Sequence, residues 1–159
     1  MQAVSSGQRT PQFWSGEAVA LQWSRPSSNL ATGMALRAFA AHPGYRLRPE
    51  VVAAGSLLKS RFLEADRYYD RQDPSYWLKF QFPFWWSNLL TALDSLSSIG
   101  FKADDDDIAD GLEWFCTHQQ KDGLWPTGYD SGQNAGANRH WVGLAACRML
   151  KRFYQGKVN

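Results

Sequence analysis

The sequence predicts an all-α fold of repeated helical hairpins, and three observations carry this prediction. Apolar residues recur at intervals of three and four in several segments, which is typical of helices with one buried face. No segment alternates apolar and polar residues for long enough to indicate a strand. When the chain is aligned with itself, the same helical pattern returns after 57 residues.

Composition limits the classes of protein that remain. The 159 residues suffice for one domain with its own core, and 44% hydrophobic with 20% charged residues is typical of a soluble globular protein. Seventeen Lys and Arg against 15 Asp and Glu leave no basic footprint for nucleic acid. The uncharged stretch over residues 80–91 is too short and too polar for a transmembrane segment. Eight Trp, six Tyr and nine Phe imply a large apolar surface that a core, a ligand or a partner must cover.

The two cysteines and the start of the chain bear on the compartment. The chain opens on small polar residues and not on a secretory signal, so a cytoplasmic location is expected. Cys116 and Cys147 fit reduced structural thiols, with Cys147 in the core, although one disulfide between them stays open. We expect neither a metal site nor a cofactor, because Cys116 and His118 would face nearly opposite directions on a helix.

The first predicted elements are an arm and a helical hairpin. Residues 1–29, which are rich in proline, glycine and serine, are predicted to form an irregular N-terminal arm. The helical domain then covers residues 30–159. Its first hairpin spans about residues 30–63, with one helix that runs to the breaker His42-Pro43-Gly44 and a second that opens at Pro49.

Residues 64–82 are predicted to form a connecting loop, because Pro74 breaks a charged and aromatic stretch. We expect the loop to expose its charged residues, namely Asp66, Arg67, Asp70, Arg71 and Asp73. Its aromatic residues are candidates for an exposed patch that binds a second chain, in company with Trp85; these are Tyr68, Tyr69, Tyr76 and Trp77. A solvated surface is the usual meaning of such a composition.

A second hairpin spans about residues 84–125, and a third unit spans 138–155. The second hairpin is predicted to place an inner helix over Trp85 to Ile99 and an outer helix over Ile108 to Gln119. Gly100 can take the left-handed conformation that ends the inner helix. The third unit contains one helix before the chain stops, so two and a half hairpins make up most of the protein.

The segment after the predicted outer helix carries a recognisable motif. Gln119, Gly123 and Trp125 resemble the glutamine-tryptophan repeat of the squalene and hopene cyclase family, Gln-x-x-x-Gly-x-Trp. The segments 82–86 and 141–152 further resemble short proteins called prenyltransferase-like or squalene-cyclase-like. The resemblance implies a terpenoid-cyclase type of α/α toroid, in which inner helices surround a cavity and outer helices surround them. With about half the hairpins of a full ring, this chain would be a partial toroid, a fragment, or a protein that completes its ring by association.

The motif has a physical explanation as a structural staple. The Gln119 side chain can bond backbone groups at a helix end while the Trp125 ring packs over it. Gly123 permits the tight turn between them.

The catalytic candidates are weak. The run Asp104 to Asp107 contains the letters Asp-x-Asp-Asp, which the resemblance links to protonation of an alkene and which make Asp106 and Asp107 candidates. The run lies between an inner and an outer helix, however, where an acidic N-cap favoured by the helix dipole explains it fully. His140 could act as an acid or a base, although a lone histidine has little specificity.

The ligand-binding candidates come from the resemblance as well. In a toroid the N-termini of the inner helices point at the cavity, which selects Phe84, Trp85, Trp86 and Trp141, together with His140. Aromatic faces can shape an isoprenoid pocket and stabilise cations, although aromatic residues at helical spacing are more often core.

The sequence therefore indicates a domain that binds or processes an isoprenoid-like apolar molecule. The alternative is a non-catalytic helical scaffold or protein-interaction module, which needs only the repeats and the aromatic surface. Possible partners are the isoprenoid-like molecule and further copies of the chain that complete the ring.

Overall fold

The computed structural model describes residues 28–128 and 131–155, and these form helices joined by turns and loops. The all-α prediction is confirmed for these ranges, in which there is no strand. The predicted N-terminal arm lies, up to residue 27, outside the described residues. The elements are α2 (Asn29–Ala41), α3 (Pro49–Lys59), the short 3₁₀ helices η2 (Tyr69–Arg71) and η3 (Pro74–Leu78), α4 (Leu89–Ile99), α5 (Asp106–Thr117) and α6 (Ala135–Tyr154). Among them, no helix combines the length and the apolar character that crossing a bilayer requires.

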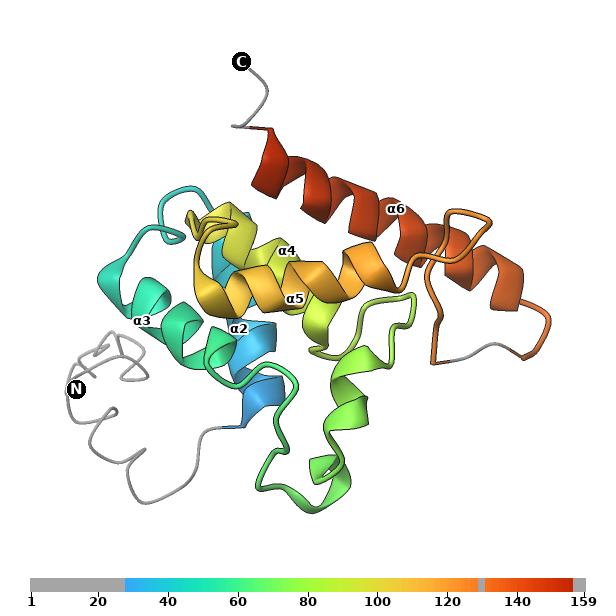
Figure 1. Cartoon of the computed structure of the whole chain (residues 1–159). Coiled ribbons are helices and arrows are strands. Elements are labelled where there is room, and N and C mark those ends of the chain that lie inside the picture. Colours follow the sequence, from blue (N-terminus) through green and yellow to red (C-terminus); the bar gives the residue numbers. More distant parts are fainter. Residues whose placement is uncertain (1–27, 129–130, 156–159) are drawn as a thin grey trace, which may run out of the picture.

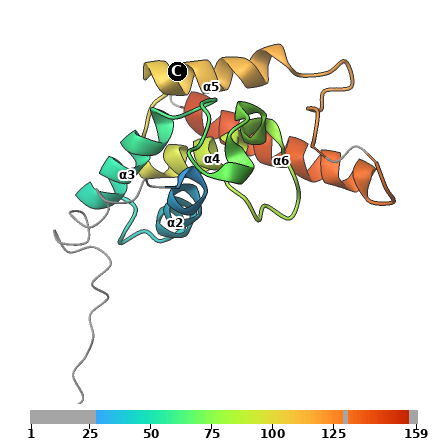
Figure 2. The ribbon, with the colours of Figure 1, turned by 90° about the horizontal axis from the view of Figure 1, so that it is seen from below.

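Helix α4 is the centre of the structure. Its most extensive contacts are with α2 and α6, and α2 and α5 lie on opposite sides of it (Figures 1 and 2). Gly111 of α5 lies against Leu89 and Leu93 of α4, and Gly55 of α3 lies against Leu96. These three leucines form one stripe of α4, and the partly exposed residues Asp94 and Ser98 lie on the opposite side. We call this the open side of α4.

Two side chains fix the beginning of α4, and they explain why it begins later than the predicted Trp85. The Asn88 side chain accepts a hydrogen bond from the Thr91 amide at 3.0 Å, and the Thr91 hydroxyl accepts one from the Asn88 amide at 3.0 Å. This capping box requires extended backbone at Asn88, so the helix begins at Leu89. At the other end Gly100 has a φ of 105°, as its left-handed role predicts.

The acidic run before α5 joins two helices. Asp105 is the N-cap, but its side chain makes no capping bond. Instead the Lys59 ammonium on α3 binds Asp105 at 2.9 Å and Asp107 at 2.6 Å. The hydrogen bond to Asp107, followed by that to Asp105, raises the pKa of Lys59 above its usual value. The carboxylates thus stabilise the N-terminus of α5 through the helix dipole, and they link α5 to α3 through the ion pair with Lys59. They do not act as a side-chain cap.

The connecting segment after α3 exposes Arg67, Asp70 and Asp73, as its composition predicts, but it buries Asp66 and partly covers Arg71. Trp77 and Phe80 are fully buried, and the Asp66 side chain is 3% exposed. Asp66 accepts a hydrogen bond from the Asn29 amide at 3.1 Å, at the first turn of α2. The Arg71 guanidinium lies 3.6 Å from the same carboxylate. The prediction of an exposed Asp66 is wrong because the unpaired amides and positive dipole of a helix N-terminus give a buried carboxylate a partner.

Asn29 extends this polar cluster. Its side-chain amide donates to the Tyr76 hydroxyl at 3.0 Å and accepts from Arg61 at 3.1 Å. Burial raises the pKa of Tyr76 to about 12, because the charged phenolate loses water. Tyr76 is half-buried and Trp77 is buried, so of the four aromatic residues predicted for an exposed patch in this segment only Tyr68 and Tyr69 are exposed.

Helix α6 holds the whole of the predicted third unit. It begins at Ala135, ahead of residue 138, and its buried stripe includes Val142, Ala146 and Met149. Cys147 falls on the outward stripe and is exposed, so its predicted place in the core is wrong. Cys116 is also exposed, and both thiols are free.

Candidate functional site

Large apolar side chains gather where α6 meets the segment before α4. We call this group the aromatic patch; it consists of Phe82, Phe84, Trp85, Trp86, Trp141 and Leu144. Trp85 is 63% exposed, Trp86 57%, Trp141 49% and Leu144 61%. Such exposure of large apolar side chains in one region is unusual for a surface that meets only water.

Contacts from two helices hold the patch in place. The Phe82 ring stacks on Trp141 of α6 with centroids 5.0 Å apart, and Phe84 meets Phe82 edge to face at 5.6 Å. The Phe82 amide donates to the Asn138 side chain at 2.6 Å, while Arg37 of α2 donates to the Phe84 carbonyl. Residues 82–86 therefore bridge α6 and α2 across the beginning of α4.

The bridge links two of the predicted ligand-binding residues, Phe84 and Trp141, through ring contacts. Both contacts are made by Phe82, which was not predicted as a ligand-binding residue. Its signal in the sequence was only its place in an aromatic run. Trp85 and Trp86 lie on the same bridge, and their exposure rules out core packing for these two rings.

The outward stripe of α6 continues beyond the patch as a row of cations. Trp141 and Leu144 lie on the same stripe of α6 as Arg148, Lys151 and Arg152. Positions 141, 144, 148 and 151 follow one another at steps of three or four residues, and position 152 comes four residues after 148. We call the three cationic residues the basic stripe. All three are exposed, and α6 contains no acidic residue.

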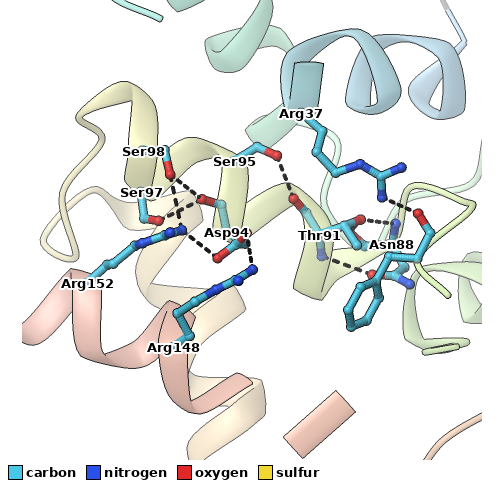
Figure 3. A network of polar contacts seen from close by, with 10 residues as sticks. Arg37, Asn88, Thr91, Asp94, Ser95, Ser97, Ser98, Arg148 and Arg152 are labelled. Carbon is cyan, nitrogen blue, oxygen red and sulfur yellow. Dashed lines mark hydrogen bonds and ion pairs between the residues drawn. The ribbon is translucent and has the colours of Figure 1, made fainter. Parts of the chain in front are cut away.

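Asp94 ties the basic stripe to the open side of α4 (Figure 3). Its carboxylate binds Arg148 at 3.1 Å and Arg152 at 2.7 Å. The Arg152 guanidinium also lies 3.2 Å from the Ser98 hydroxyl. One carboxylate against two guanidinium groups leaves a local excess of positive charge. Little in the sequence indicates this network, because the two arginines lie 54 and 58 positions after Asp94.

The glutamine-tryptophan motif closes the turn after α5. The Trp125 indole is 2% exposed and donates to the Phe115 carbonyl at 2.7 Å. That carbonyl belongs to the last turn of α5, where no amide of the same helix can reach it. The Gln119 side chain donates to the Gly123 carbonyl at 2.9 Å, within the turn, and Gly123 has a φ of 81°. The bond to the helix end is thus made by Trp125, and not by Gln119 as predicted.

A second bond set links this turn to α6. Arg139 donates to the Gln120 side chain at 2.6 Å and to Asp122 at 2.7 Å. The hydrogen bond from the Leu124 amide is the largest cause that lowers the pKa of Asp122 below its usual value, and the hydrogen bond from Arg139 is the next. Arg139 is therefore engaged in holding the turn.

The catalytic candidates do not share the patch. Asp106 and Asp107 lie in the first turn of α5, and Asp107 is bound to Lys59. Helix α5 packs on the leucine stripe of α4, away from the open side. The His140 ring bonds the Gly136 carbonyl at 2.7 Å and is exposed. None of these groups faces the aromatic patch together with another acid or base.

His118, one of the two residues considered for metal binding, lies against its own helix. The His118 ring stacks on Trp114 with centroids 4.4 Å apart and bonds the Trp114 carbonyl at 2.9 Å. Within residues 28–128 and 131–155 there is no group of three or more ligating side chains that could hold a metal ion.

Comparison with known proteins returns no match for this chain, whether with protein families, curated proteins or solved structures. The assignment of function therefore depends on the chain's own residues.

Proposed function

We propose that the chain is a helical domain that binds an isoprenoid-like apolar molecule on the aromatic patch. The observation that supports this most is the Phe82–Trp141 stack with the exposed Trp85 and Trp86 beside it. Rigid aromatic faces bind branched hydrocarbon chains at low entropic cost, because an aromatic side chain has few rotatable bonds. The motif at Gln119, Gly123 and Trp125 fits the same proposal, as part of a partial toroid of repeated hairpins.

The proposed role is binding without catalysis. Protonation of an alkene needs an acid beside the bound hydrocarbon. On the open side of α4 the carboxylate is Asp94, and two arginines engage both of its oxygens. Asp107 is engaged by Lys59 on the other side of α4.

The test is titration of the protein with farnesol, followed by tryptophan fluorescence. Binding should change the emission and raise the melting temperature of the chain. The Trp141→Ala variant should lose both responses, whereas Leu47→Ala, which changes an apolar residue that is 67% exposed outside the patch, should keep them. Equal responses from the two variants would overturn the proposal.

The alternative is an interaction module in which a second copy of the chain covers the patch. The exposure of Trp85, Trp86 and Leu144 favours it, because a patch of this kind is typical of an interface. Light scattering distinguishes the two. A dimer that Leu144→Glu converts into a monomer, together with no response to farnesol, would favour the interaction module.

A further inference from the structure

The aromatic patch and the basic stripe lie next to each other along α6. Trp141 and Leu144 belong to the patch, and Arg148, Lys151 and Arg152 follow on the same outward stripe. The 20 residues of α6 correspond to a helix about 30 Å long. Apolar and cationic side chains thus line one edge of the molecule.

The charge of this edge differs from that of α5. Helix α6 has no acidic residue, and the acid nearest to its stripe, Asp94, is outnumbered by its two arginine partners. The outward residues of α5 include Asp106, Asp110 and Glu113. An extended anionic surface would therefore attract α6 and repel α5, which orients the molecule before any contact is made.

The exposed rings of the patch suit a flat occupant. Trp85 and Trp86 are consecutive residues on the bridge, with more than half of each side chain exposed. Tryptophan prefers the boundary between the headgroups and the acyl chains of a bilayer, because its ring is apolar while its indole N–H can still bond. Lysine and arginine near such rings add attraction to anionic headgroups.

We propose that this edge docks on the surface of an anionic lipid bilayer. The rings of the patch insert at the level of the headgroups, and the basic stripe binds anionic lipids beside them. The docking is peripheral, since the described helices include none that could cross the bilayer. It uses the same aromatic patch as the proposed binding of an isoprenoid-like molecule, but it does not require that molecule.

The test is co-sedimentation of the full chain with vesicles. One set contains equal parts of phosphatidylcholine and phosphatidylglycerol, and the other contains phosphatidylcholine alone. We expect binding to the anionic vesicles, a blue shift of the tryptophan emission, and weaker binding in high salt. No binding to the anionic vesicles, or equal binding to both sets, would overturn the proposal.

Matched variants separate the two parts of the edge. The double change W85S and W86S should lower the partition constant about tenfold or more, since two interfacial rings are lost. Lys151→Glu should lower it about tenfold and remove much of the salt dependence. The controls Leu47→Ser and Arg46→Glu change exposed residues of the connection between α2 and α3, and should bind as the parent does. Equal losses in variants and controls, with circular dichroism unchanged, would contradict the assignment of this edge.

Discussion

Replacement of Trp125 by Phe tests whether the buried indole holds the end of α5. The indole N–H donates to the Phe115 carbonyl at 2.7 Å, and the side chain is 2% exposed. Phe keeps an aromatic ring but has no donor, so the carbonyl is left buried without its partner. An unsatisfied buried group costs about 1 to 3 kcal/mol. The smaller ring adds about 1 to 2 kcal/mol, a fraction of the cost of full truncation.

We therefore expect Trp125→Phe to lower the free energy of unfolding by about 3.5 kcal/mol, the sum of the middles of these two ranges. For a chain of this size each kcal/mol corresponds to about 2 to 4 °C, so the melting temperature should fall by about 7 to 14 °C. The measurements are urea denaturation followed by far-ultraviolet circular dichroism, and a thermal scan.

Two other tryptophans provide the comparison. Trp85→Phe makes the same chemical change at a side chain that is 63% exposed, and it should alter stability by about 0.5 kcal/mol or less. Trp77→Phe should resemble Trp125→Phe, because the buried Trp77 indole donates to the Glu64 carbonyl at 2.9 Å. The reasoning is refuted if Trp125→Phe is as stable as the parent, or if Trp85→Phe costs as much as Trp125→Phe.

Three other changes test the ion pair, the buried phenol and the helix contact. In urea titrations Lys59→Met should lower the free energy of unfolding by about 1 kcal/mol at low salt and by less at high salt. The same loss at both salt concentrations would contradict a role for the ion pair. Tyr76, with a pKa of about 12, keeps its proton in the folded chain while the unfolded phenol ionises near 10. The contribution of the Tyr76 phenol to the free energy of unfolding is complete below pH 10 and is lost as the pH rises to 12. In Tyr76→Phe the free energy of unfolding should therefore fall less steeply between pH 10 and 12. The same slope in parent and variant would show that Tyr76 does not cause the fall. Gly33→Ala should lower the free energy of unfolding by about 1 to 3 kcal/mol, because the new methyl group overlaps the Ser87 side chain. Adding Ser87→Gly to this variant should recover part of the loss, and a double variant whose loss equals the sum of the two single losses would contradict the contact.

The existence of the helices could be predicted because their signals are local. The apolar spacing of Val51 and Leu58 predicted the buried face of a helix, and both residues are buried. In α2 the spacing of Leu30, Met34, Ala38 and Phe39 indicated the wrong face, since Met34 and Ala38 are exposed while Leu36 is buried. Pro49 marks the start of α3 and Gly100 the end of α4, since each residue has a backbone preference that does not depend on distant contacts.

The predicted start of α4 was wrong although the signal for the correct start was present. The sequence Asn88-Leu-Leu-Thr91 is a capping box of the type that begins a helix, but the apolar pattern extends back through Trp86 and suggested an earlier start. A cap decides the boundary because it satisfies backbone amides. An apolar residue before the cap does not, and here Trp86 is exposed.

The polar contacts across the fold could not be predicted. Asp66 is one of several aspartates among arginines in its segment, and only the approach of α2 distinguishes it from Asp70 and Asp73. Asp94 likewise acquires its arginine partners from the packing of α6 on α4. The aromatic patch was predicted in part, because its residues are rare and large, but the stack through Phe82 depends on the path of the bridge.

The capping of α2 by Asp66 has a consequence for the order of events during synthesis. The amide at the start of α2 receives its carboxylate from a residue 37 positions later, and the Leu30 carbonyl accepts from Ser87, 57 positions later. The Ser28 side chain caps the Ala31 amide locally, but the Asn29 amide lacks its carboxylate partner until residue 66 has been made. The Asn29 amide should therefore exchange with solvent in a nascent chain cut before residue 66, and become protected once the chain extends past Ser87.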